Sequence, residues 1–335
     1  MKYFLFGGIA AAFTLFGLSL IYGASATLEF SGIAQALRGR AFDPLLACAL
    51  VMVILGFGFK VAAVPFHLWA PDAYQGAPAP AAALIASGSK LASFLILAKV
   101  LLLAFPEMGG AAFWGRLAPG WKPLLAALAA LSVIFGNLAA ISQSNLKRLL
   151  AYSAIAHAGY ALIGLLAAEA HVIPAVFYYM TTYALTVIGA FGVAALMEGL
   201  GSRGAIADLA GMSRQNPLIA ACMMIFMLSL SGIPPLPGFI GKFYLFSAAA
   251  SSDMASFGLI WLVALAMVMS AVSLYYYLKA LKAIYVTPPA SGAVFRFPLA
   301  GTLAVATLAL LVILAGLFPN QILGPVFAAM SGVAH

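Results

Sequence analysis

Charged residues are scarce in this sequence, and acidic residues are the scarcest. Only 7% of the 335 residues are charged, whereas 65% are hydrophobic. A soluble protein of this length could not hide so much apolar sequence, and no polar stretch is long enough for an aqueous domain. The formal net charge of +8 does not indicate nucleic-acid binding, because the basic residues lie mostly in short loops, where they set topology. The composition therefore predicts an all-α polytopic membrane protein.

Cysteine is also rare, and motifs for metal or redox chemistry are missing. Cys48 and Cys222 are isolated residues inside apolar runs, which indicates a packing role. The sequence has no CxxC motif, no His/Cys cluster with metal-ligand spacing and no phosphate-binding glycine loop. We therefore expect no cofactor, no metal and no redox centre within this chain.

Hydropathy and proline positions predict about nine membrane-spanning segments, two of them discontinuous. Although Lys2, an apolar run and Ala24-Ser25-Ala26 resemble a signal peptide, the run of about 20 residues favours a retained helix. One break is expected near Val64-Pro65 and the other at GIPPLPG, residues 232–238. The expected segments are 3–24, 44–72, 79–105, 122–142, 147–168, 172–198, 217–249, 256–285 and 299–319.

The distribution of Lys and Arg predicts a cytoplasmic N-terminus and an external C-terminus. This orientation places most of the loop cations inside, namely Lys2, Lys147, Arg148, Arg203, Arg214, Lys279, Lys282 and Arg296. A smaller group falls outside, namely Arg38, Arg40, Arg116 and Lys122.

The remaining basic residues are lysines inside apolar runs: Lys60, Lys90, Lys99 and Lys242. A lysine at bilayer depth costs about 2.5–3.5 kcal/mol on insertion scales and usually faces a protein interior or a water path. Lys60 and Lys90 are expected near mid-depth, and Lys242 follows the second break closely, so these three are candidate proton carriers. Lys99 lies near a helix end, where it can extend to the interface.

All acidic residues map to loops or helix ends, so no carboxylate is expected beside the deep lysines. The eight acids are Glu29, Asp43, Asp72, Glu107, Glu169, Glu198, Asp208 and Asp253. A deep lysine without a partner must release its proton or find an acid elsewhere, and both outcomes suit proton transfer.

Other polar residues within the apolar runs allow two interpretations each. His157 is predicted deep and could relay protons or pack by hydrogen bonding. Asn137 could line a path or bond across helices, and His67 lies in the first break. Tyr275-Tyr276-Tyr277 is typical of an aromatic belt near a membrane surface.

Three stretches carry a resemblance to a known family: FKVAAVPFHLWAPDAYQGAPAP with GSK, QSNLKRLLAYSAIAHAGYALIG, and LSGIPPLPGFIGKFYLF. The chain resembles the antiporter-like membrane subunits of NADH-quinone oxidoreductase (respiratory complex I), and most of all the subunit N family. Mrp-type sodium/proton antiporter subunits share much of the pattern.

The resemblance implies a fourteen-helix fold with two inverted five-helix repeats, no cofactor, and proton transfer through buried lysines. Lys60, Lys90 and Lys242 match lysines of the seventh, eighth and twelfth helices of the family, and His157 matches a histidine position in the tenth. The glutamate that pairs with the first lysine lies on a fifth helix, which has no counterpart here. We therefore expect one antiporter-like domain over 1–335: residues 1–105 as the remainder of the first repeat, 122–285 as the second, and 299–319 as the C-terminal helix.

The resulting hypothesis is a proton-translocating membrane-arm subunit, coupled to quinone reduction elsewhere in the complex. Expected partners are the lipid bilayer, other membrane-arm subunits and a separate chain that could carry the missing helices. Its expected location is a bacterial inner membrane, with the C-terminus in the periplasm. The alternatives are an Mrp-type Na⁺/H⁺ antiporter subunit and a truncated scaffold remnant.

Overall fold

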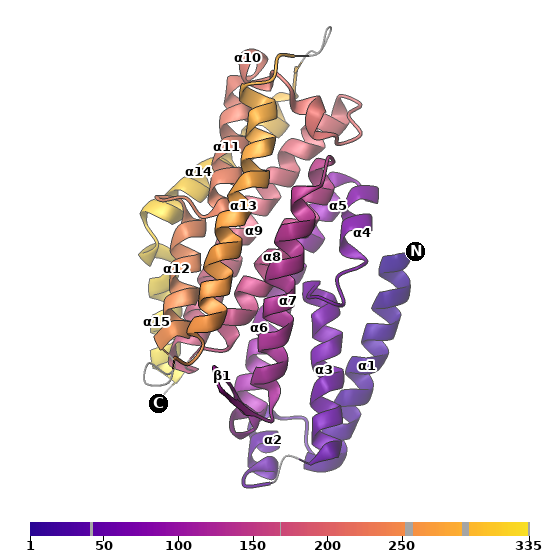
Figure 1. Cartoon of the computed structure of the whole chain (residues 1–335), viewed down its shortest axis with the longest axis vertical. Helices are drawn as coiled ribbons and strands as arrows, with labels where there is room; N and C mark the ends of the chain where they lie inside the picture. Colours follow the sequence, from indigo (N-terminus) through magenta and orange to yellow (C-terminus); the bar gives the residue numbers. More distant parts are fainter. Residues whose placement is uncertain (41–42, 168, 252–256, 290–294, 334–335) are drawn as a thin grey trace.

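The computed structural model describes residues 1–40, 43–167, 169–251, 257–289 and 295–333. Figure 1 shows a bundle of long helices with one small hairpin at its lower end. The prediction of an all-α polytopic membrane protein is confirmed. Asp253 lies outside the described residues.

The predicted spanning segments all coincide with helices. These are α1 (Lys2–Ser25), α3 (Pro44–Val61) with α4 (Ala70–Gly76), the run from α5 (Ala79–Leu84) through α6 (Lys90–Lys99), α7 (Trp121–Ile141), α8 (Leu146–Leu165), α9 (Glu169–Gly199), α11 (Pro217–Ser231) with α12 (Pro237–Ala250), α13 (Ile260–Tyr285) and α14 (Leu299–Leu317). Within the described residues, 7 continuous helices are long and apolar enough to cross a membrane.

Both predicted breaks are present, and each begins in the same way. After α3 the chain turns at Ala62 with φ 57°, and after α11 it turns at Gly232 with φ 88°. A residue in this left-handed region ends a helix, and the amides that follow bond back to the last turn, as Ala63 does to Gly58 and Ile233 does to Leu228. Unpaired backbone groups are costly in a membrane, so surrounding protein must satisfy them. At the first break the hydroxyl of Ser132 on α7 accepts a 2.9 Å hydrogen bond from the Val64 amide.

The third segment is helical as predicted, but it is not a regular α-helix. π-helical turns η1 (Ile85–Ser89) and η2 (Val100–Ala104) precede and follow α6. Such turns occur mostly inside α-helices and frequently at functional sites. Hydropathy could not reveal them, because one extra residue per turn leaves the apolar composition unchanged.

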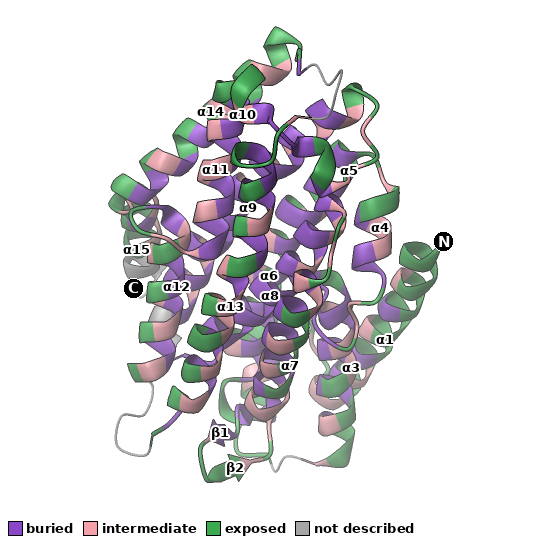
Figure 2. Cartoon of the chain, turned by 45° about the horizontal axis from the view of Figure 1, so that its top comes forward, coloured by how far each residue is buried: buried purple, intermediate pink, exposed green. Residues whose placement is uncertain are grey.

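Helix α8 lies at the centre of the bundle. Nearly all of its residues are buried, and it packs against α4, α7, α9, α12 and α13. Figure 2 shows this buried interior surrounded by helices with exposed outer faces. Small residues allow the close packing: a Cβ on Gly136 would lie 2.5 Å from the Ala156 amide nitrogen, and one on Gly159 would lie 2.8 Å from that of Val133.

The predicted loops contain short elements that hydropathy did not indicate. They are α2 (Phe30–Leu37), η3 (Pro106–Met108), the antiparallel hairpin of β1 (Ala111–Phe113) and β2 (Arg116–Ala118), η4 (Ile206–Leu209), α10 (Met212–Gln215) and α15 (Asn320–Val333).

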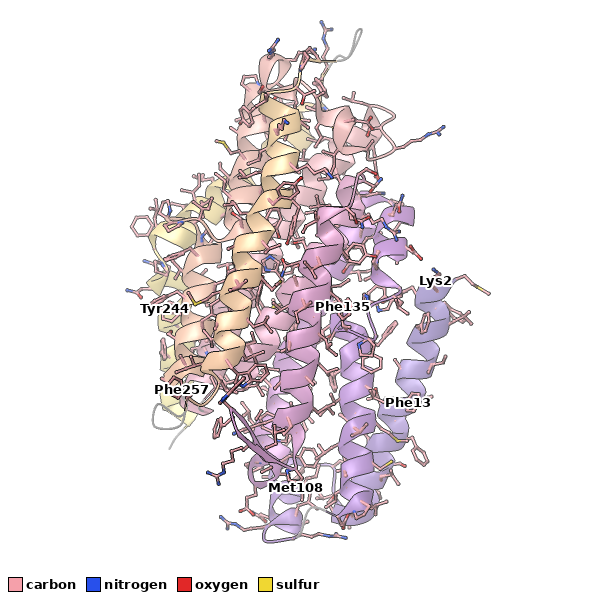
Figure 3. The ribbon with its side chains drawn as sticks, viewed as in Figure 1. Lys2, Phe13, Met108, Phe135, Tyr244 and Phe257 are labelled. Atoms are coloured by element: carbon pink, nitrogen blue, oxygen red, sulfur yellow. The ribbon has the colours of Figure 1, made fainter. Side chains whose placement is uncertain are left out.

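Ion pairs join charged side chains in two separate regions of the bundle. Near Lys2, the Asp72 carboxylate bonds to Lys2 and, at 2.7 Å, to Arg148. Toward the opposite end, near Met108, Arg38 pairs with Glu107 at 3.4 Å (Figure 3).

Candidate functional site

Lys90 is buried against the central helix. It is the first residue of α6, directly after the π-helical turn η1, and its side chain is only 1% exposed. Its Nζ donates a 2.7 Å hydrogen bond to the carbonyl oxygen of Ala154 on α8. None of the ion pairs among the described residues involves Lys90.

His157 lies three residues beyond Ala154 on the same helix and is also buried. Its two ring nitrogens are hydrogen-bonded to tyrosine hydroxyls: Nδ1 lies 2.7 Å from Tyr179 Oη of α9, and Nε2 lies 3.2 Å from Tyr277 Oη of α13. Both nitrogens of an imidazole can exchange protons, and a hydroxyl can donate and accept at once. His157 is therefore a junction between three helices.

Lys242 lies at the second break, where it is 5% exposed. Its Nζ donates to the carbonyl oxygens of Leu230 at 3.1 Å and Ser231 at 2.9 Å, and to Ser270 Oγ at 2.9 Å. These carbonyls end α11, so the break presents the negative end of a helix dipole to the ammonium group. Lys242 also lines a cavity of ≈ 540 Å³ between α12 and α13, whose other walls are mostly apolar.

A polar network connects the Lys242 region with α7 and α13. The Lys242 Nζ lies 5.1 Å from the centre of the Tyr160 ring on α8, in cation–π geometry. Tyr160 Oη accepts a 3.0 Å hydrogen bond from Asn137 Nδ2, and Tyr276 donates to Asn137 Oδ1 at 2.9 Å. Asn137 thus bonds across helices, which is one of its two predicted roles.

The structure brings three of the predicted residues together around α8. On α8, His157 lies three residues beyond Ala154, which Lys90 contacts, and three residues before Tyr160, whose ring Lys242 faces. Each of the three is buried, and each can hold or release a proton. No group of three His, Cys, Asp or Glu side chains placed to hold a metal ion occurs in the described part of the chain.

Lys60 lies apart from these three residues in this structure. It is exposed in the last turn of α3, and no hydrogen bond or ion pair of its Nζ is found among the described residues. The physical reason is that α3 packs on α1 and α6 and leaves another face uncovered. Next to Lys60 in the sequence, the carbonyl oxygen of Phe59 accepts a 3.2 Å hydrogen bond from Trp69 Nε1.

Tyrosines around His157 were not identified as site residues from the sequence. Tyr276 and Tyr277 are fully buried, whereas Tyr275 is 61% exposed, so the aromatic-belt interpretation is wrong for two of the three. On a helix successive side chains point about 100° apart, so three adjacent tyrosines cannot all face lipid. Nothing in the sequence placed Tyr179 or Tyr277 beside His157, because they lie on other helices.

A partly buried ion pair was also missed. Lys147 Nζ lies 2.5 Å from Glu198 Oε1 and donates to the Ala77 carbonyl at 2.8 Å. The other carboxylate oxygen, Oε2, accepts a 2.9 Å hydrogen bond from the Ala79 amide. This pair joins the start of α8, the end of α9 and the start of α5. Both residues lie at helix ends, where the sequence indicated only solvated charges.

Comparisons with known proteins place this chain in a family. Residues 1–273 match the family described as NADH:quinone oxidoreductase/Mrp antiporter, transmembrane. The chain is 52% identical over 324 residues to NADH-quinone oxidoreductase subunit N 2 of Acidobacterium capsulatum, covering 96% of this chain and 65% of the relative. It is 41% identical to subunit N of Desulforamulus reducens over 96% of this chain and 64% of that one. The chain thus spans somewhat less than two thirds of the length of these relatives.

Solved structures share the fold. A chain of respiratory complex I from Thermus thermophilus with bound aureothin aligns with a TM-score of 0.79 and 38% identity, covering 96% of this chain and 67% of that one. A chain of an archaeal membrane-bound sulfane sulfur reductase aligns with a TM-score of 0.85 and 28% identity, over 99% and 65%. A chain of the Mrp complex from Dietzia aligns with a TM-score of 0.83 over 96% and 65%, but at 20% identity this likeness shows the fold alone.

Proposed function

Because this chain belongs to the NADH:quinone oxidoreductase/Mrp antiporter transmembrane family, we propose that it serves as a proton-translocating membrane-arm subunit of an NADH-quinone oxidoreductase. In this proposal, quinone reduction occurs in other subunits of the complex. The chain's own contribution is to accept, hold and release protons in the membrane.

One observation carries the proposal, namely the arrangement of Lys90, His157 and Lys242 around α8. Burying an ammonium group is costly, and a fold normally offsets the cost with a carboxylate. Among the described residues, the partners of these ammonium groups are carbonyl and hydroxyl oxygens. Such neutral partners can hold the protonated lysine and still permit its neutral form. A proton on one group also disfavours a proton on the next, which suits stepwise transfer.

In the proposed route, protons enter from the cytoplasmic side near Lys60, pass Lys90 and His157, and leave near Lys242. Exposed Lys60 would be covered by a segment or partner that is not part of this chain and that supplies a carboxylate. The cavity beside Lys242 is the proposed release side. The same proposal places the N-terminus in the cytoplasm and the C-terminus in the periplasm of a bacterial inner membrane, with residues 1–105 and 122–285 as inverted repeats.

The test uses methionine substitutions in the assembled respiratory complex, reconstituted in vesicles. Lys90→Met should lower proton pumping per NADH oxidised, because methionine keeps the length and apolar stem of the side chain but binds no proton. Lys99→Met is the matched control, since Lys99 lies on the same helix and is exposed. Normal pumping by both Lys90→Met and Lys242→Met would refute the relay.

The same vesicles distinguish the alternatives. Sodium-dependent proton exchange in the absence of NADH and quinone would instead indicate a secondary antiporter. Assembly of the complex with unchanged pumping in every lysine variant would indicate a scaffold.

A further inference from the structure

The link between α4 and α5 consists of two residues, Ala77 and Pro78, and a single ion pair bonds to the backbone at both ends of it. At one end, the carbonyl oxygen of Ala77 accepts a 2.8 Å hydrogen bond from Lys147 Nζ. At the other end, the amide of Ala79 donates a 2.9 Å hydrogen bond to Glu198 Oε2. Because Lys147 and Glu198 also bond to each other, at 2.5 Å, the two side chains enclose the link.

The backbone groups that this pair binds are those that the link leaves open. Pro78 has no amide to donate, and its carbonyl oxygen already accepts from the Ala81 amide. The Ala79 amide is at the first turn of α5, where amides have no partner within the helix. The Lys147 side chain is 7% exposed and the Glu198 side chain is 27% exposed, so the bonds are partly shielded from water, which strengthens them.

The helical run that follows the link carries Lys90. From Ala79 the chain continues without interruption through α5, η1 and α6, and Lys90 is the first residue of α6. On α8, Lys147 and Ala154 are seven residues apart, which places them on one face of that helix and about 10 Å apart. Lys147 holds the start of the run, and Ala154 accepts the hydrogen bond of Lys90. Helix α8 is therefore joined to the run at two points.

The π-helical turn η1 (Ile85–Ser89) lies between these two points, and Lys90 follows it directly. All three parts of the run, α5, η1 and α6, pack along α9, which also carries Glu198. Packed helices can slide past one another by small distances. A hydrogen-bonded attachment at the start of the run opposes such sliding, and the position of Lys90 relative to α8 depends on it.

We propose that Lys147 and Glu198 are positioning residues for Lys90. By clamping the link at Pro78, they fix the start of the run from α5 to α6 and so hold Lys90 Nζ at the carbonyl oxygen of Ala154. The pair carries no proton in this proposal and acts through Lys90. Its effect on proton transfer rests on the proposed function, whereas the clamp can be tested by geometry alone.

The direct test is a density map of the assembled complex that carries Lys147→Met. Methionine keeps the apolar stem but donates no hydrogen bond, so the link should shift and the distance from Lys90 Nζ to the Ala154 oxygen should exceed about 3.5 Å. Lys147→Arg keeps the charge and the donors and should retain the Lys90 bond. If Lys147→Met does not assemble, Glu198→Gln provides the same test, because its single amide oxygen cannot serve both partners. An unchanged Lys90–Ala154 bond in the variant examined would overturn the proposal.

Proton pumping by a charge-swapped variant is the second readout. Lys147→Glu combined with Glu198→Lys restores opposite charges but not the clamp. A carboxylate cannot donate to the Ala77 carbonyl oxygen, and an ammonium group cannot accept from the Ala79 amide. We expect the swapped variant and Lys147→Met to pump fewer protons per NADH oxidised, and Lys147→Arg to pump as the wild type does. Full pumping by the swapped variant would show that the charges alone suffice and would overturn the clamp.

Glu107→Gln is the matched control. Glu107 likewise pairs with a cation, Arg38, and accepts a 3.1 Å hydrogen bond from a backbone amide, that of Gly39, but this pair is exposed. Normal pumping in Lys147→Met, alongside loss in Lys90→Met and Lys242→Met, would refute the positioning role and leave the proposed function standing. Normal pumping in Lys90→Met and Lys242→Met would refute the function, and the density map would still decide whether the clamp positions Lys90.

Discussion

Replacement of Lys242 by arginine separates a structural role of its charge from a role in proton release. The lysine ammonium makes three hydrogen bonds, to Leu230, Ser231 and Ser270. Hydrogen bonds to charged groups contribute about 1.5–3 kcal/mol each, and burial of the charge opposes them by an amount of similar size. Arginine keeps the charge and several donors, but it does not release its proton in proteins.

We therefore expect Lys242→Arg to assemble and to oxidise NADH while pumping fewer protons. A positioned proton donor or acceptor typically raises the rate of proton transfer by about 10²–10⁴-fold. The rate of proton transfer through this subunit should therefore fall by at least about 10²-fold. The assay is the quenching of a pH-sensitive dye in vesicles, normalised to NADH oxidation, with Lys242→Met beside it. Wild-type pumping by Lys242→Arg combined with loss in Lys242→Met would refute proton release and show that only the charge is needed.

Two further predictions concern stability. Gly136→Ala should destabilise the α7–α8 contact by about 1–3 kcal/mol, because the new Cβ would lie 2.5 Å from a backbone nitrogen of α8. Thermal inactivation measures this effect. Gly8→Ala is the control, because a Cβ there meets nothing within 4 Å. Glu198→Gln should lower the free energy of unfolding by about 1–3 kcal/mol, because it leaves the Lys147 ammonium without its carboxylate partner. Adding Lys147→Met should restore part of this loss, as measured in an assembly assay. Equal stability of Glu198→Gln and the wild type would show that the pair is screened by solvent.

The positions of the helices in this fold follow from the local sequence, because the length of each apolar run and the positions of proline are local properties. Hydropathy located the spans, and Pro65 and GIPPLPG located both breaks, because a helix cannot continue where the backbone amide is missing. The burial of Lys90 and Lys242 was predictable for the same reason. Their position in long apolar runs predicted a place within the membrane.

Tertiary packing alone decided which of these residues meet. Lys60 and Lys90 have similar sequence surroundings, yet Lys60 is exposed and Lys90 is buried. The difference arises because α6, which carries Lys90, packs between α3 and α9, whereas α3, which carries Lys60, packs mainly on α1 and α6. The tyrosines around His157 come from α9 and α13, more than 20 residues and more than 100 residues away, and the Lys147–Glu198 pair joins residues 51 apart. The sequence by itself determined that protonatable groups must lie within the membrane. Only the packing of helices around α8 determined which of them share a path, because contacts between distant segments depend on which helix faces come together.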